Sequence, residues 1–169
     1  MSKGLESVKS VGEVLECPDI EKNAGKPVID EVSGEFVFED VSFNYPNNPQ
    51  HALDGINLRV RPGETIALVG PSGAGKSTMA QLVIGFIRAT EGRVLLDGYD
   101  MNDLDLRSYR RFISVVTQET ILFNDTVANN ICYGQMEPVD EARIIDAAKA
   151  AHAWNFIQRL PEGLQTQVG

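Results

Sequence analysis

The 169-residue sequence has few cysteines and no long apolar run. Its two cysteines, Cys17 and Cys132, lie far apart and form no C-x-x-C pair, so the sequence gives no sign of a disulfide scaffold or a zinc knuckle. We expect two reduced thiols. No stretch approaches the roughly 18–20 apolar residues of a membrane-spanning helix, and residues 1–14 lack the apolar region of a signal peptide. We therefore expect this chain neither to span a membrane nor to be exported.

The sequence also has fewer basic than acidic residues. The chain has 15 lysines and arginines against 24 aspartates and glutamates, which gives a net charge of −9 and a pI of about 4.7. Such a surface repels phosphate polymers, so we expect no nucleic acid among its partners. With 43% hydrophobic and 23% charged residues, the composition is that of a soluble globular protein about one domain long.

The first 34 residues are predicted to be a helical lead-in followed by a linker. Leu5, Val8, Val11 and Val14 recur at helical spacing, whereas residues 20–34 are polar and contain glycine and proline. The lead-in helix either packs on its own domain or is the end of a helix that starts upstream. Residues 35–118 are predicted to form a β subdomain with an α/β core, and residues 119–169 the start of a helical subdomain.

The strand predictions rest on apolar periodicity. Phe36 and Phe38 share one face, but the phase changes at residues 39–40, which predicts two short strands separated by a break or bulge. Further strands are expected at residues 56–60, 93–96 and 113–116, together with a buried central strand at 66–69. Helices are expected from the mid-seventies to about Arg88, at 106–112, and from about Pro138 to Leu160, with Ile144, Ala147, Ala148 and Ala151 on one face. Strands alternating with helices predict an α/β fold.

Residues 70–78 read GPSGAGKST and match the phosphate-loop pattern G-x-x-x-x-G-K-[S/T] between a predicted strand and a predicted helix. Glycines allow main-chain amides to converge on an anion, and the helix start adds free N–H groups. Lys76 supplies a positive charge for the outer phosphates, and the Ser77 hydroxyl is a ligand for Mg²⁺. The predicted phosphate-binding residues are Gly70, Pro71, Ser72, Gly73, Ala74, Gly75, Lys76, Ser77 and Thr78.

Three residues outside the loop are candidates for related roles. Tyr45 lies 25 residues before Gly70, where an aromatic face would stack on a purine base, although such a residue is also common in a core. Gln118 follows a predicted strand and offers an amide oxygen to Mg²⁺ and to the attacking water. Asp97 ends an apolar run but is followed by Gly98, which is typical of a turn rather than a metal site.

Together these segments resemble the nucleotide-binding domain of ABC transporters. The matching phrases are residues 38–46 (FEDVSFNYP), 53–56 (LDGI), 63–78 and 115–118 (VVTQ), and residues 122–134 resemble the exporter branch. The resemblance implies a P-loop ABC ATPase core, incomplete here, with an antiparallel β subdomain. It also implies that Tyr45 stacks on adenine, that residues 70–78 are the Walker A segment, and that Gln118 is the Q-loop glutamine.

The resemblance further implies ATP and Mg²⁺ as cofactors and coupling of ATP hydrolysis to transmembrane transport. The implied partners are a second nucleotide-binding domain, in a homodimer or heterodimer, and the coupling helices of a membrane domain, with residues 121–123 as candidate contacts. The implied location is the cytoplasmic face of a membrane, within an integral membrane transporter.

The sequence lacks an apolar run that ends in Asp-Glu, and the family's LSGGQ signature would lie beyond Gly169. We therefore expect a truncated piece of a longer subunit that binds ATP weakly or not at all, does not hydrolyse it by itself, and is marginally stable or self-associating. Two alternatives stay open: a non-catalytic nucleotide-sensing module, and another P-loop enzyme such as a small-molecule kinase. A soluble ABC ATPase of DNA repair or translation is disfavoured by the acidic charge balance and the lack of coiled-coil heptads.

Overall fold

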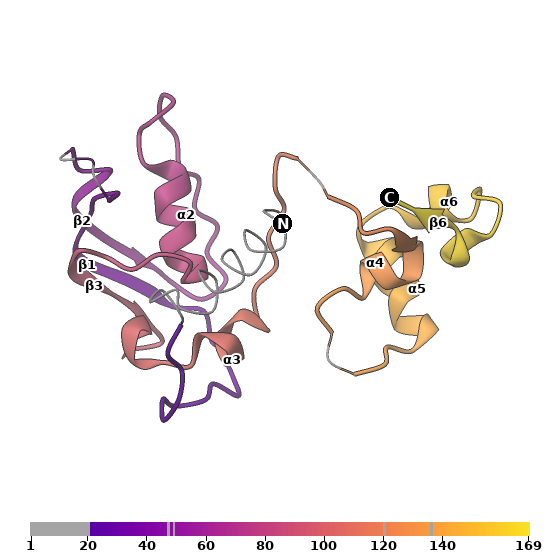
Figure 1. Cartoon of the computed structure of the whole chain (residues 1–169), viewed down its shortest axis with the longest axis horizontal. Coiled ribbons are helices and arrows are strands. Elements are labelled where there is room, and N and C mark those ends of the chain that lie inside the picture. Colours follow the sequence, from indigo (N-terminus) through magenta and orange to yellow (C-terminus); the bar gives the residue numbers. More distant parts are fainter. Residues whose placement is uncertain (1–20, 47, 49, 120, 136) are drawn as a thin grey trace, which may run out of the picture. The chain divides into compact units, whose positions relative to one another are not determined.

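The computed structural model describes residues 21–46, 48, 50–119, 121–135 and 137–169. The chain divides into two compact units, Met1–Ile113 and Ser114–Gly169 (Figure 1). The predicted lead-in helix lies outside the described residues. Residues 21–35 contain no helix or strand, as the prediction of a linker or extended segment required.

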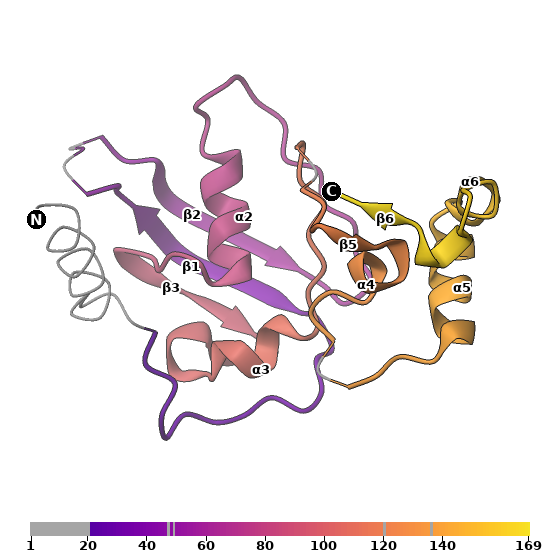
Figure 2. The same cartoon turned by 45° about the vertical axis from the view of Figure 1, so that its right-hand side comes forward.

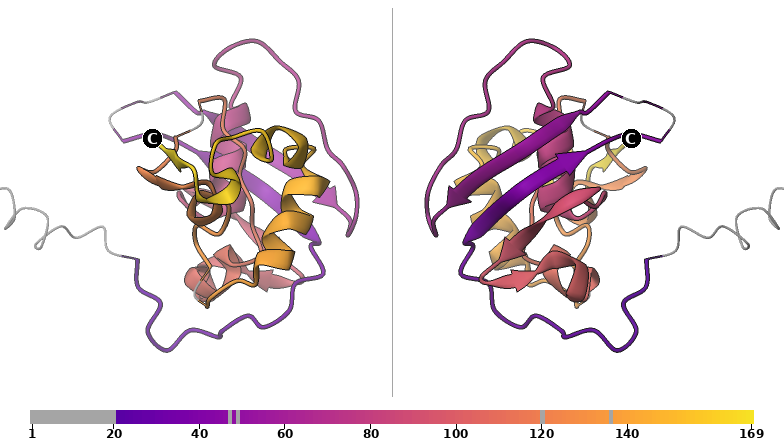
Figure 3. Two further views of the ribbon diagram at one scale, coloured as in Figure 1. Left: turned by 90° about the vertical axis from the view of Figure 1, so that its right-hand side faces the viewer. Right: turned by 90° about the vertical axis from the view of Figure 1, so that its left-hand side faces the viewer.

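The first unit is built on an antiparallel sheet with strand order β2-β1-β3-β4. Its strands are β1 (Phe36–Phe43), β2 (Leu53–Val60), β3 (Glu91–Leu96) and β4 (Tyr99–Asp100). The right-hand view of Figure 3 shows the longer strands side by side in front of the helix that packs against them. The antiparallel β subdomain expected from the sequence is therefore present.

The prediction of two short strands at residues 36–45 is wrong, whereas the bulge is real. Asp40 has a φ of 47°, and the pairing with β2 shifts between Phe38 and Val41. The extra residue of the bulge allows Phe38 and Val41 to face the same core although they lie three positions apart. One bulged strand therefore accounts for the change of phase.

Helix α2 (Lys76–Ile84) lies across one face of this sheet (Figure 2). Met79 and Leu82 on the helix share a buried cluster with Phe38 and Leu96 on the strands. The helix ends before the predicted Arg88 because Gly85 adopts a left-handed φ of 74°, which directs the next N–H groups back to the carbonyls of the last turn. This packing fixes the axis of the helix that begins at the phosphate loop.

A 3₁₀ turn, η1 (Met101–Asp103), and helix α3 (Leu106–Arg110) complete the first unit. The Asp105 carboxylate accepts hydrogen bonds from the N–H groups of Arg107 and Ser108, so it caps the start of α3. Leu106 and Tyr109 are buried in the same core as α2, whereas Arg107 is exposed.

The predicted buried strand at residues 66–69 and the predicted strand at 113–116 are both absent. Residues 64–70 have no strand pairing, and Val69 is 91% exposed. Val116 is 97% exposed. A parallel central strand needs neighbours on both sides to satisfy its N–H and C=O groups, and no described residue pairs with either segment. An apolar run is therefore not sufficient to form a strand without partner strands.

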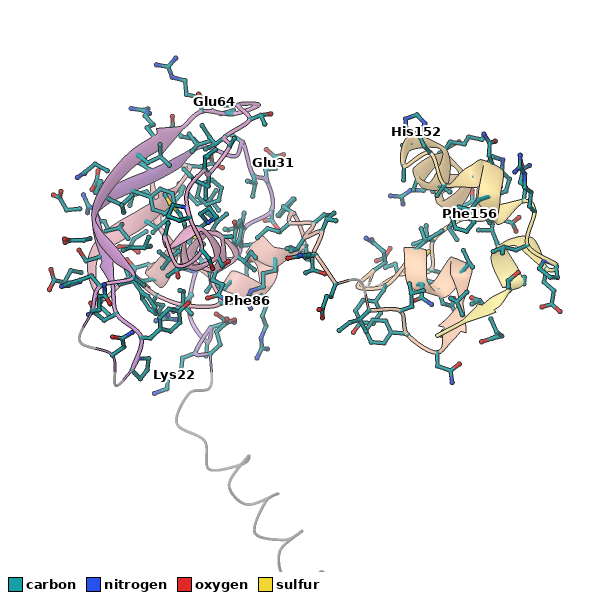
Figure 4. All side chains as sticks on the ribbon, turned by 90° about the horizontal axis from the view of Figure 1, so that it is seen from above. Lys22, Glu31, Glu64, Phe86, His152 and Phe156 are labelled. Carbon is teal, nitrogen blue, oxygen red and sulfur yellow. The ribbon has the colours of Figure 1, made fainter. Side chains whose placement is uncertain are left out.

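Most of the regular secondary structure of the second unit is helical, but the helix expected from about Pro138 to Leu160 is divided into two. The unit contains α4 (Val127–Ile131), α5 (Glu141–Ala150), α6 (Trp154–Ile157), the 3₁₀ turn η2 (Gly163–Gln165), and a small pair of strands, β5 (Asp125–Thr126) and β6 (Gln167–Val168). The Asp140 carboxylate caps α5, so Pro138 lies before the helix rather than in its first turn. Ile144 and Ala148 are buried, whereas Ala147 and Ala151 are exposed. His152 and Phe156 are exposed, and His152 lies at the edge of this unit in Figure 4.

Candidate functional site

The phosphate loop, residues 70–75, leads directly into α2. Gly73 and Gly75 have φ values of 82° and 81°, the left-handed conformation that glycine adopts without strain. At Gly75 a Cβ would lie 2.5 Å from the Ala52 carbonyl oxygen and 2.7 Å from a methyl group of Leu53. Glycine is therefore required at position 75 both by the backbone conformation and by the close approach of β2.

Most main-chain N–H groups around this turn have no acceptor among the described residues. Within the described part of the chain, only Ala74 in the loop donates a main-chain hydrogen bond, to the Pro71 carbonyl at 3.3 Å. The first N–H of α2 to be paired belongs to Met79, which donates to Gly75. The N–H groups with no acceptor among the described residues are those of Ser72, Gly73, Gly75, Lys76, Ser77 and Thr78. Such a series of donors at a helix start is a binding site for an anion.

The Lys76 side chain lies beside these donors. Its ammonium donates to the carbonyls of Gly70 at 2.9 Å and Pro71 at 2.7 Å, so the side chain folds back along the loop instead of extending into solvent. Ser77, the next residue, is exposed in the first turn of α2. The loop and the first turn of α2 thus combine amide donors, a cation and the exposed Ser77 hydroxyl within a few residues.

Tyr45 lies against the same helix. Its hydroxyl is 3.1 Å from the Thr78 hydroxyl and donates to the Gln81 side-chain oxygen at 3.3 Å. Its ring packs edge-on against Phe43, with centroids 4.9 Å apart, and the residue is 40% exposed. The hydroxyl bonds and the packing against Phe43 therefore hold the side chain in place, while part of its surface stays accessible to solvent.

These residues line one hollow of about 360 Å³, here called the loop hollow. No described residue in its lining is a carboxylate, although the chain as a whole carries an excess of acidic residues. The sequence analysis did not assign the lining residues from the β1–β2 connection, because a short polar turn carries no motif. The lining consists of Tyr45, Asn48, Gln50, His51, Ala52, Ser72, Gly73, Gly75, Lys76, Ser77 and Thr78.

Asp97 is a turn residue, as predicted. It has a φ of 50° and joins β3 to β4 together with Gly98. Its two carboxylate oxygens accept the N–H groups of Ser33 at 2.7 Å and Glu35 at 2.8 Å. Its hydrogen-bonding capacity is therefore used to anchor the segment before β1.

Gln118 is not among the residues that line the loop hollow. It lies in the second unit, where its side chain is exposed, and its assigned role stays a prediction. Among the described residues there is no group of three or more histidine, cysteine, aspartate or glutamate side chains that would hold a metal ion by itself. Mg²⁺ commonly binds through one or two protein oxygens and the phosphates of its substrate, and the exposed Ser77 hydroxyl suits that mode. In the described residues no helix is long and apolar enough to cross a bilayer.

Comparison with known proteins gives consistent results. The family model described as "ABC transporter" matches residues 53–168. The chain is 47% identical over 167 residues to an "ATP-dependent lipid A-core flippase" of Methylobacillus flagellatus, covering 98% of this chain and 28% of that protein. A flippase of the same name from Pseudoalteromonas atlantica is 44% identical over 167 residues, covering 99% of this chain and 28% of that protein.

A solved structure, of a bacterial Atm1-family ABC exporter with ATP bound, aligns with a TM-score of 0.86 and 35% identity. The alignment covers 98% of this chain and 29% of that one. The chain therefore spans less than a third of the length of these relatives.

Proposed function

The chain belongs to the ABC transporter family, and we propose that it is the ATP-binding part of an exporter whose complete subunit couples ATP hydrolysis to transport. The observation that carries the proposal is the loop hollow. It places the Lys76 ammonium and six N–H groups that have no acceptor among the described residues beside an accessible tyrosine ring, with no described carboxylate in the lining. A nucleotide, in which anionic phosphates are attached to an aromatic base, matches that arrangement.

In this proposal each part of the site binds a different part of the nucleotide. The loop amides and Lys76 bind the phosphates, Ser77 contributes a ligand to the accompanying Mg²⁺, and the accessible face of Tyr45 stacks on adenine. Base stacking on an aromatic residue is worth about 1–3 kcal/mol, and stacking alone discriminates weakly between bases. Gln118 is assigned to Mg²⁺ and the attacking water through the resemblance alone.

The proposed organisation of the complete protein also rests on the family. We assign residues 1–34 to a lead-in and linker, 35–118 to the β subdomain with the Walker A core, and 119–169 to the start of the helical subdomain. The proposed partners are a second nucleotide-binding domain and the coupling helices of a membrane domain, at the cytoplasmic face of a membrane. Residues 121–123 are candidates for the latter contact because Ile121, Leu122 and Phe123 are each at least 45% exposed.

We further propose that the 169-residue chain binds nucleotide weakly and does not turn it over. Hydrolysis in phosphate-loop ATPases requires a carboxylate at a strand end near Mg²⁺, and Asp97 is bonded to the backbone of residues 33–35 instead. The names of the relatives make a lipid the first substrate to test with the complete protein. A steady-state ATPase rate from the 169-residue chain would contradict this part of the proposal.

Titration calorimetry with Mg-ATP tests the binding proposal. Removing a charged hydrogen-bond donor is worth about 1.5–3 kcal/mol, so Lys76→Met should weaken ATP binding roughly 10- to 100-fold. The matched control is Lys149→Met, at an exposed lysine on α5 in the second unit, which should bind ATP as the unmodified chain does. Equal affinities for both variants would contradict the proposal.

A further inference from the structure

The carboxyl end of α2, opposite the phosphate loop, is held by two side chains of α3. The Tyr109 hydroxyl donates to the Val83 carbonyl at 2.7 Å. The Arg110 guanidinium donates through Nε to the Ile84 carbonyl at 3.2 Å and through Nη2 to the Gly85 carbonyl at 2.8 Å. The last carbonyls of a helix lack intrahelical partners and carry the negative end of its dipole, so a cation is favourable there. Three consecutive carbonyls at the end of the phosphate-loop helix therefore depend on two adjacent residues.

Arg110 also contacts the segment before the first strand. Its Nη2 forms an ion pair with the Glu21 carboxylate at 2.5 Å, and both side chains are about three-quarters buried. The guanidinium carbon lies 5.5 Å from the centroid of the Phe86 ring. One planar cation thus joins the end of α2 to Glu21, and arginine suits this role because its donors form a rigid fork.

Neighbours of Arg110 fix the rest of this segment. Ile29 donates its N–H to the Ser108 hydroxyl at 2.8 Å and accepts from Arg111 at 3.2 Å. The Asp105 N–H bonds to the Pro27 carbonyl at 3.0 Å, and the Asn23 side chain accepts from the Leu106 N–H at 3.3 Å. Residues 21–35 have no helix or strand of their own, so their conformation depends on these bonds and on Asp97.

We propose that Arg110 is a positioning residue that couples nucleotide binding at the phosphate loop to the ordering of residues 21–35. This inference rests on the proposed function, because it requires a nucleotide at the loop. Helix α2 is nine residues long, a rigid element of about 14 Å. Fixing its first turn on phosphate reduces the motion of its last turn, and Arg110 and Glu21 transmit that constraint to the segment. Because coupling between two sites is reciprocal, loosening the segment weakens nucleotide binding.

Hydrogen exchange measured by mass spectrometry on the 169-residue chain tests the coupling. In the unmodified chain, saturating Mg-ATP should slow exchange of the amides in residues 70–78. It should also slow exchange in residues 21–35 by about fivefold or more, which corresponds to the lower end of typical coupling free energies. In Arg110→Ala at saturating Mg-ATP, the loop should still be protected, whereas residues 21–35 should exchange at the nucleotide-free rate. The matched control is Arg88→Ala, which removes an exposed arginine shortly after α2 and should retain both effects.

Two further variants separate coupling from loss of stability. Arg110→Lys keeps the charge but offers one nitrogen in place of a fork that reaches three acceptors, so it should retain only part of the protection in residues 21–35. Glu21→Gln keeps a hydrogen-bond acceptor and leaves the bonds from Arg110 to the end of α2 in place. In this variant, Mg-ATP should protect the loop amides as it does in the unmodified chain, but it should protect residues 21–35 less. Protection of residues 21–35 in Arg110→Ala equal to that in the unmodified chain would overturn the inference.

The wild-type experiment distinguishes failure of the coupling from failure of the proposed function. Protection of residues 70–78 without any change in residues 21–35 would contradict the coupling alone. No protection of residues 70–78 at any Mg-ATP concentration would contradict the proposed function and the coupling with it.

Discussion

The phosphate loop and the segment before it differ sharply, although the sequence predicted both clearly. Residues 70–75 form the expected turn into α2, whereas residues 66–69 do not form the expected strand and leave Val69 91% exposed. The loop depends on glycine conformation and on one close neighbour in β2, which this chain supplies. The strand depends on hydrogen bonds to other strands, and no described residue provides them. The loop therefore forms from residues close to it in sequence and space, whereas the strand does not form without partner strands among the described residues.

The largest expected effect contrasts a paired strand with the unpaired segment. Val41 in β1 is fully buried, whereas Val69 is almost fully exposed. Val41→Ala should lower the free energy of unfolding by about 2–3 kcal/mol, because it removes buried methyl groups and leaves a cavity. Val69→Ala should change it by less than about 0.5 kcal/mol. Urea unfolding followed by circular dichroism measures both, and a comparable loss in the two variants would show that residues 66–69 are packed after all.

A second comparison lies within the loop. Gly73 and Gly75 share a left-handed φ, but a Cβ at Gly75 meets the Ala52 carbonyl, whereas at Gly73 it meets nothing within 4 Å. Both alanine substitutions incur the strain of a left-handed backbone, and Gly75→Ala adds a steric clash of about 1–3 kcal/mol. We expect Gly75→Ala to weaken ATP binding about tenfold more than Gly73→Ala in calorimetric titrations. The reverse order would mean that the approach of β2 does not shape the loop.

Two substitutions at Tyr45 distinguish the contribution of its ring from that of its hydroxyl. Tyr45→Phe keeps the ring and loses the bonds to Thr78 and Gln81, so the unfolding free energy should fall by about 0.5–1.5 kcal/mol. Tyr45→Ala should in addition weaken ATP binding by about 1–3 kcal/mol through lost stacking. If both variants bind ATP equally well, the ring does not contact the base.

The smallest effect concerns pH. Partial burial raises the pKa of the Glu21 carboxyl, but hydrogen bonds from Arg110 and Asn23 outweigh it and hold the pKa below the ordinary value of 4.5. A lowered carboxyl pKa stabilises the folded state fully above the ordinary value, and this contribution is lost as pH falls through the folded-state pKa. The stability difference between the unmodified chain and Glu21→Gln should therefore be constant near pH 7 and shrink below about pH 4.5. A difference that grows on acidification would contradict the ion pair.

The parts of the fold that the sequence predicted correctly depend on local chemistry. Glycines specified the loop, the phase change at residues 39–40 indicated the bulge, and the Asp97-Gly98 pair indicated a turn. Tyr45 was assigned to the site through resemblance, but its bond to Thr78, 33 residues away, depends on tertiary packing. The same holds for Arg110, whose acceptors on α2 lie 25 and 26 residues earlier. No periodicity or motif reports such pairings.

The central claim is that the main-chain amides of the phosphate loop and the first turn of α2, those of Ser72, Gly73, Gly75, Lys76, Ser77 and Thr78, bind the phosphates of a nucleotide. A ¹H–¹⁵N NMR titration of the 169-residue chain with Mg-ATP, with adenosine as the phosphate-free control, tests it most directly. We predict that Mg-ATP shifts the amide resonances of Gly73, Gly75, Lys76 and Ser77 in a saturable manner and that adenosine leaves them nearly unchanged. Saturable shifts confined to other parts of the chain, with these four resonances unmoved, would contradict the account.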